Sequence, residues 1–162
     1  MDTVAIFLAQ DFYLVVLALA VAILVLRYRR RLLELGGAAV MIGGLAFALA
    51  QAGARLIADP RPFLVSGGPP LIPSAQDNGF PSGHTLLVAT AAAVVTVANP
   101  RAGALFWGAA ALVGLARVYA HVHHLLDVAG SLVIVGLALA AYVGIRSVWH
   151  GRNAAARAPS AD

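Results

Sequence analysis

The segment "ARVYAHVHHLLD" (residues 116–127) holds one arginine, three histidines and one aspartate in an otherwise apolar chain. His123 and Asp127 are four residues apart, a spacing that puts two side chains on one face of a helix. The carboxylate could then orient the imidazole and stabilise its cationic form. A further histidine, His84, follows the tripeptide Pro-Ser-Gly. One histidine that attacks and another that protonates the leaving oxygen are suited to phosphoryl transfer.

Three arginines, Arg55, Arg61 and Arg117, could supply positive charge for such a reaction. The guanidinium group matches the oxygens of a phosphate or carboxylate and stays charged. Ser82 and Gly83 precede a predicted helix, and the backbone N–H groups of a helix N-terminus favour an anion. Because the arginines neutralise charge, the pattern implies no metal ligand set and no cofactor.

The composition indicates an integral membrane protein. Of 162 residues, 61% are hydrophobic and 11% are charged, and the mean hydropathy is +0.87. Soluble domains carry roughly 25% charged residues. The absence of cysteine excludes disulfides and thiolate chemistry. All 11 basic residues are arginine, which we do not interpret as a sign of nucleic-acid binding.

Five apolar segments predict an all-α bundle of membrane-spanning helices, since a span needs ~20 residues. They are residues 12–26, 36–57, 84–98, 103–120 and 125–145. Residues 3–10 either extend the first span or form an interfacial helix. Arginines follow the first span where a signal peptide would have small residues at its cleavage site, so no signal peptide is expected. We expect one domain, residues 1–150, and a disordered cytoplasmic tail, residues 151–162.

Five spans would place eight arginines on one side of the membrane. These are Arg27, Arg29, Arg30, Arg31, Arg101, Arg146, Arg152 and Arg157. The positive-inside rule makes that side cytoplasmic. Arg55, Arg61 and Arg117 then lie on the outer side with the histidines, where topology does not require them. Charged groups in such positions are functional candidates.

These residues resemble the signature of the type 2 phosphatidic acid phosphatase superfamily, which is related in fold to vanadium haloperoxidases. The signature has three blocks, K-x6-R-P, P-S-G-H and S-R-x5-H-x3-D. Here the first retains Arg61 and Pro62, the second is complete at residues 81–84, and the third has Arg117, His123 and Asp127. The resemblance extends over roughly residues 36–148 and implies a haloperoxidase-like phosphatase core.

The resemblance also implies a role for each residue. His123 is the expected nucleophile, which forms a phosphohistidine, and Asp127 orients it. His84 is the expected general acid. The expected phosphate-binding residues are Arg61, Arg117, Ser82 and Gly83. His121 and His124 match no block and are expected to support the site or a polar interface.

Two positions depart from the signature. Ala116 stands where the third block has serine, and Ala54 stands where the first block has lysine. Arg55 is next to Ala54, but one helical residue is a turn of about 100°. Arg55 therefore replaces the lysine only if the local geometry differs.

The segments "DPRPF" and "DNGFPSGHT" resemble undecaprenyl-diphosphate phosphatases of the bacitracin-resistance type, although those often carry aspartate in place of Gly83. The predicted function is hydrolysis of a polyprenyl diphosphate to the monophosphate at the outer face of the cytoplasmic (inner) membrane. One alternative is a lipid monophosphate substrate: phosphatidylglycerophosphate, phosphatidate or a polyprenyl-linked phosphate. Another is a non-catalytic lipid-phosphate transporter or binding protein, which would not need both His84 and His123. The oligomeric state stays open.

Overall fold

The computed structural model describes residues 2–155 as helices joined by short turns and one long loop. The helices are α1 (Asp2–Gln10), α2 (Phe12–Arg27), α3 (Leu32–Leu56), α4 (Pro62–Val65), α5 (Gly83–Ala98), α6 (Pro100–Tyr119) and α7 (Leu125–Ala155), with a 3-10 turn at Arg29–Arg31. Within these residues no strand forms, although Pro60 and Asn78 make an isolated antiparallel bridge. The predicted all-α bundle is therefore confirmed.

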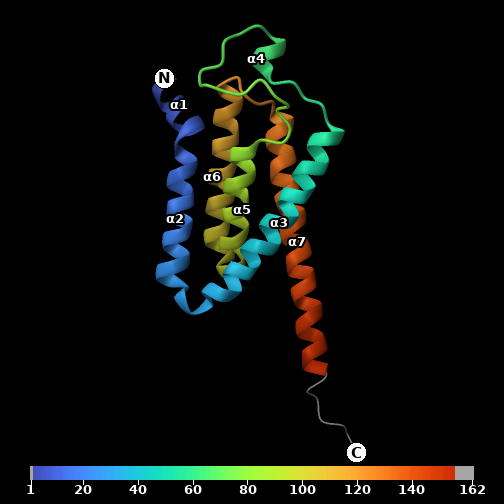
Figure 1. Ribbon diagram of the computed structural model, residues 1–162. Helices are drawn as coiled ribbons and strands as arrows, with labels where there is room; N and C mark the ends of the chain where they lie inside the picture. The colour runs from blue at the N-terminus through green and yellow to red at the C-terminus, as the bar shows by residue number, and fades with distance from the viewer. Residues whose placement is uncertain (1, 156–162) are drawn as a thin grey trace, which may run out of the picture.

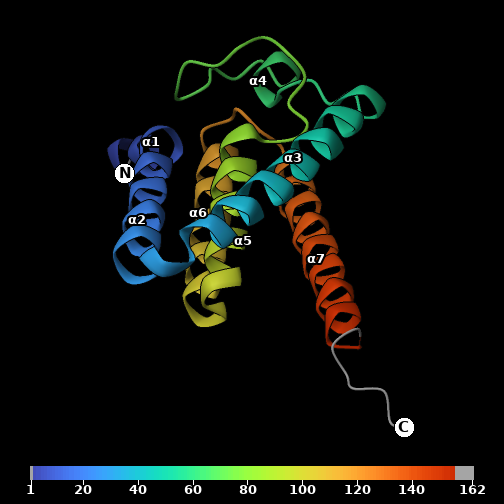
Figure 2. The ribbon, with the colours of Figure 1, turned by 60° about the horizontal axis from the view of Figure 1, so that its bottom comes forward.

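Helix α5 lies at the centre of the bundle. It packs against α2, α3, α6 and α7, and α1–α2 and α3–α7 lie on opposite sides of the α5–α6 pair (Figures 1 and 2). The loop that carries α4 covers the end where α5 and α7 begin and α6 ends (Figure 1). The same end therefore holds the ends of α3 and α6, the starts of α5 and α7, and the longest loop.

Among residues 2–155, three helices are long and apolar enough to cross a membrane: Arg29–Leu56, Pro100–Tyr119 and Leu125–Arg152. The pair α1 and α2 makes a fourth if both belong to one span, which would then bend by 49°. Helix α5 has only 16 residues, fewer than the ~20 that a lipid-exposed span needs. Its apolar face is covered by protein, because Val88, Ala89 and Ala92 are fully buried. The predicted span at residues 84–98 is thus a short central helix.

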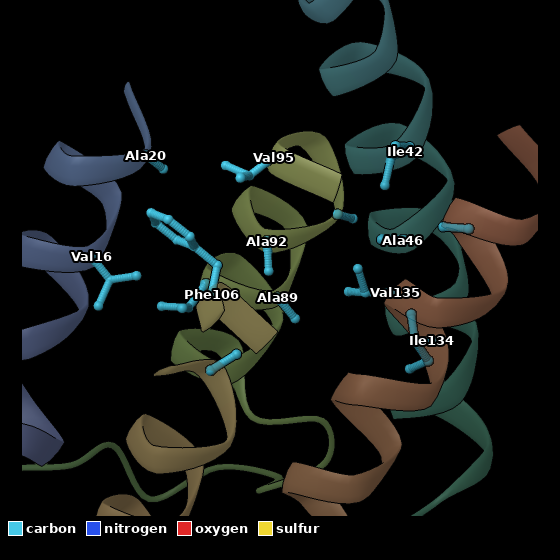
Figure 3. Packing of buried hydrophobic residues seen from close by; sticks show 14 of the residues in the cluster. Val16, Ala20, Ile42, Ala46, Ala89, Ala92, Val95, Phe106, Ile134 and Val135 are labelled. Atoms are coloured by element: carbon cyan, nitrogen blue, oxygen red, sulfur yellow. The ribbon is translucent and has the colours of Figure 1, made fainter. Parts of the chain in front are cut away.

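Small side chains form much of the core between the helices. In Figure 3, Ala89 and Ala92 of α5 lie between Phe106 of α6 and Ala46 of α3. Small residues let helices approach closely, which is how helices associate in a membrane. Many large apolar side chains point outward instead; Leu33 is 96% exposed. This arrangement suits a lipid environment.

The ends of the chain refine two predictions. Residues 3–10 fall within α1, a separate helix that packs against α6 and buries Ala9 completely. Helix α7 continues to Ala155, so residues 151–155 of the predicted tail are helical. The rest of that tail, residues 156–162, lies outside the described residues.

Candidate active site

His123 and Asp127 are in direct contact at the loop-covered end of the bundle. His123 Nδ1 lies 3.0 Å from Asp127 Oδ2, and both residues are almost fully buried. A carboxylate only accepts hydrogen bonds, so Nδ1 carries the proton and Nε2 keeps its lone pair. The pairing therefore leaves Nε2 as the ring nitrogen with a lone pair.

The contact forms at a helix start and not along a helix face. His123 lies two residues before α7 begins, and Asp127 is in the first turn of α7. Asp127 Oδ2 also accepts the backbone N–H of His124 at 2.9 Å. A carboxylate in a first helical turn satisfies a free N–H and interacts favourably with the helix dipole. The same oxygen thus caps α7 and orients His123.

The surroundings of His123 favour its neutral form. Burial lowers the pKa of His123, the hydrogen bond that its Nδ1 donates to Asp127 opposes this shift, and Arg117 and Arg61 lower the pKa further. A neutral imidazole at neutral pH has the lone pair that nucleophilic attack requires.

Arg61 lies against His123 Nε2. Its Nη1 is 3.2 Å from His123 Nε2 and donates to the Val122 carbonyl at 2.9 Å. Its Nε donates to Asp77 Oδ1 at 2.7 Å. Arg61 precedes Pro62, which begins α4, so the turn of the loop directs its side chain into the bundle. The guanidinium is therefore fixed beside the place that a phosphoryl group attached to Nε2 would occupy.

Arg117 approaches the site from the last turn of α6 and is 6% exposed. Its Nη1 donates to the Ala9 carbonyl at 3.0 Å. Its Nε is buried and has no partner within the described part of the chain. An unpaired buried donor is costly, and a phosphate oxygen would satisfy it.

The Pro-Ser-Gly-His segment begins α5. Ser82 is fully buried and accepts a hydrogen bond from Thr85 Oγ1 at 3.0 Å. Gly83 is exposed, and a Cβ added there would meet no atom within 4 Å, so no side chain crowds the start of α5. The His84 ring packs edge-on against Tyr13 of α2, with centroids 4.5 Å apart. A helix N-terminus and a held imidazole thus face the same end of the bundle.

The remaining predicted residues lie farther out. Arg55 is in the last turn of α3 and exposed, and it makes no hydrogen bond or ion pair with any residue that the structure describes. His121 is exposed in a left-handed conformation, with φ of 63°. His124 Nδ1 lies 3.0 Å from Asp59 Oδ1. The structure brings together Arg61, His123 and Asp127 by direct contact, and does not bring Arg55 to them.

A model of one protein family, described as the PAP2 superfamily, matches residues 33–150. The chain belongs to the PAP2 superfamily. The match includes every predicted site residue. PAP2 members are phosphatases, so the chain is a membrane hydrolase of phosphoric esters that acts on lipid phosphates. No curated protein matches the sequence.

Two polar residues that link the PAP2 blocks, Ser131 and Asn78, were not among the predicted site residues. Ser131 Oγ donates to the Asp127 carbonyl at 2.7 Å and to the Ser82 carbonyl at 3.0 Å, and so joins α7 to the start of α5. The signal in the sequence was a polar residue four positions after Asp127, in an otherwise apolar stretch of the predicted helix.

Asn78 holds the loop against α3. Its Nδ2 donates to the carbonyls of Ala54 and Ile57 at 2.9 and 2.8 Å, and its Oδ1 accepts from the Asp59 N–H at 2.9 Å. Asn78 thereby caps the end of α3 at the position where the PAP2 signature has its lysine. The Asp-Asn-Gly run, typical of turns, was the signal in the sequence.

We predict that Asn78→Ala loosens the loop and lowers turnover, because the loop carries Arg61 and Asp77. Each lost hydrogen bond contributes about 0.5–1.5 kcal/mol. The rate of phosphate release should fall, and chymotrypsin should cleave faster at Phe63 and Leu64. Gln76→Ala, in the same exposed loop, is the matched control. Equal proteolysis and turnover in both variants would contradict this role of Asn78.

Proposed function

We propose that the chain hydrolyses a polyprenyl diphosphate to the monophosphate through a phosphohistidine at His123. The observation that carries the proposal is the orientation of His123. Asp127 holds its Nδ1, and its Nε2 lies 3.2 Å from the guanidinium of Arg61. The nucleophile and the positive charge that a transferring phosphoryl group needs are therefore adjacent.

In the first step, the Nε2 lone pair of His123 attacks the terminal phosphorus, and the bond to the bridging oxygen breaks. His84 donates its proton to that oxygen, and the lipid leaves as its monophosphate. Asp127 stabilises the positive charge that develops on the imidazole. Arg61, Arg117 and the helix N-terminus at Gly83 stabilise the equatorial oxygens.

In the second step, water attacks the phosphorus of the phosphohistidine. His84, now neutral, takes a proton from this water, and the bond between phosphorus and Nε2 breaks. Inorganic phosphate leaves, and His123 returns to its neutral form. Each histidine thus serves in both steps.

An apolar groove supports a lipid substrate with a long tail. The groove lies between α1 and α6, has a volume of about 590 Å³ and is lined by residues that include Leu8, Leu112, Leu115 and Ala116. Ala116 precedes Arg117, the arginine with an unpaired Nε. The serine of the PAP2 signature is thus replaced by an apolar residue on the groove wall. A tail in the groove would end next to Arg117.

The positions of the arginines support an outer active site in the cytoplasmic membrane. The turn between α2 and α3, the start of α6 and the end of α7 lie opposite the candidate active site (Figure 1). Those segments hold seven of the eight arginines that we assigned to the cytoplasm. The eighth, Arg157, lies outside the described residues.

We predict a preference for a diphosphate. Phosphate release from a prenyl diphosphate should be at least about tenfold faster in kcat/KM than from a prenyl monophosphate, phosphatidate or phosphatidylglycerophosphate, a difference of ~1.4 kcal/mol. The measurement is phosphate release from this panel in mixed micelles, with His123→Ala as the blank. Faster release from a glycerophospholipid phosphate would assign the chain to the monophosphate class. Binding of the lipids without release would indicate a carrier.

We predict different roles for the two histidines. His123→Ala should abolish turnover, and should abolish the phosphoenzyme trapped by a rapid alkaline detergent quench, which preserves the acid-labile bond between phosphorus and Nε2. His84→Ala should lower lipid turnover by about 10²–10⁴-fold, but should lower hydrolysis of an activated aryl phosphate less, since that leaving group needs little protonation. His121→Asn is the control. Loss of the trapped intermediate in His124→Ala and not in His123→Ala would show that His124, and not His123, carries the phosphoryl group.

We predict that the loop faces the outside of the cell. The chain has no cysteine, so single cysteines can be placed at Ser66 in the loop and at Gly151 in α7. In spheroplasts, a membrane-impermeant maleimide should label Ser66→Cys at once and Gly151→Cys only after permeabilisation. The reverse pattern would place the active site in the cytoplasm.

A further inference from the structure

Three potential metal ligands gather behind the nucleophile. Asp59, His124 and Asp127 each offer one ligand atom, and these atoms lie within 4.8 Å of one another. Asp59 and His124 have no part in the proposed phosphoryl transfer. Asp127 does, because its other oxygen holds His123.

Two atoms of this cluster are buried and have no hydrogen-bond partner within the described residues. They are Asp127 Oδ1 and His124 Nδ1, and the Asp127 side chain is fully buried. His124 Nδ1 is 3.0 Å from Asp59 Oδ1 but does not make a well-directed hydrogen bond. A buried carboxylate oxygen beside a second carboxylate needs a proton or a positive partner. No arginine supplies it, because Arg61 donates to Asp77 and Val122.

The backbone fixes Asp59 in this place. Its N–H donates to Asn78 Oδ1 at 2.9 Å, and its carbonyl accepts the Gly79 N–H at 2.8 Å. A Cβ at Gly79 would lie 2.9 Å from Asp127 Oδ2 and 3.1 Å from the Asp59 carbonyl oxygen. Only glycine therefore allows the loop to bring the two carboxylates this close.

The cluster is accessible from water. A hollow of about 330 Å³, lined by residues that include Asp59, Asp77 and Asn78, opens beside it. The side chains of Asp59 and His124 are 18% and 40% exposed. An ion could enter by this route and keep water as a further ligand.

We propose that Asp59, His124 and Asp127 bind one divalent transition-metal ion of the Zn²⁺ class, and that this ion inhibits the phosphatase. One imidazole nitrogen and two carboxylate oxygens form a ligand set typical of Zn²⁺, whose ligands bind at about 2.0–2.2 Å. The imidazole favours Zn²⁺ over Mg²⁺ and Ca²⁺, which prefer oxygen ligands.

The inhibition rests on the proposed function, whereas the binding does not. An ion on Asp127 Oδ1 adds two positive charges close to His123. When His123 attacks, its ring becomes cationic, and a neighbouring cation opposes this change. The ion also withdraws the charge of Asp127 from the imidazole. The phosphatase should therefore work in excess chelator and slow down when Zn²⁺ is added.

Binding is tested by equilibrium dialysis of Zn²⁺ against the purified full chain in detergent, with any histidine tag removed. We expect one ion per chain. Asp59→Asn and His124→Gln should each weaken binding at least about tenfold. Mutation of a residue that only hydrogen-bonds to a metal ligand typically already has an effect of this size. The controls are Asp77→Asn and His121→Asn, which change the same residue types in the same two loops. Equal binding in all four variants, or no bound ion because the carboxylates share a proton, would overturn the proposal.

Inhibition is tested on the same variants, each compared with its own rate of phosphate release in chelator. Zn²⁺ should inhibit the unmodified chain, and the inhibitory concentration should rise at least about tenfold in Asp59→Asn and His124→Gln, in step with their weaker binding. Stoichiometric binding without inhibition would overturn the inhibitory role. If no lipid phosphate is hydrolysed even in chelator, the proposed function fails, while the dialysis result still decides the metal site.

Discussion

The structure depends on a carboxylate, Asp127, that is fully buried in a bundle of apolar helices. A charge in such a place is stable only if it is paired and hydrogen-bonded. Asp127 Oδ2 lies 3.0 Å from His123 Nδ1 and accepts the backbone N–H of His124. Removing one partner of a buried pair typically costs about 3–5 kcal/mol. The contact that stabilises Asp127 also fixes the orientation of the His123 ring.

The rest of the site is arranged around that carboxylate. The Asp127 carbonyl accepts hydrogen bonds from Ser82 N and Ser131 Oγ, which join the start of α5 to α7. The loop brings Arg61 to His123, and Asn78 ties the loop to α3. Parts of the chain that are far apart in sequence, and that hold the separate PAP2 blocks, thus meet at one point.

Much of the architecture follows from the sequence. Apolar segments predict the helices, and the family signature predicts that Arg61, His123 and Asp127 meet, as they do. Other features depend on contacts between distant residues. The exposure of Arg55 depends on how far α3 turns before it ends, and neither composition nor motif shows this. Asn78 donates to two backbone carbonyls. Every residue has such a carbonyl, so the sequence does not show which ones Asn78 contacts.

The central claim is that His123 Nε2 is the atom that carries the phosphoryl group. Vanadate is a phosphate mimic, and a structure of the protein with bound vanadate tests the claim directly. We expect vanadium within bonding distance of His123 Nε2, with Arg61 and Arg117 in contact with its oxygens and His84 on the side of the leaving group. Vanadium bonded to His84 or His124, with His123 still against Arg61, would contradict the account.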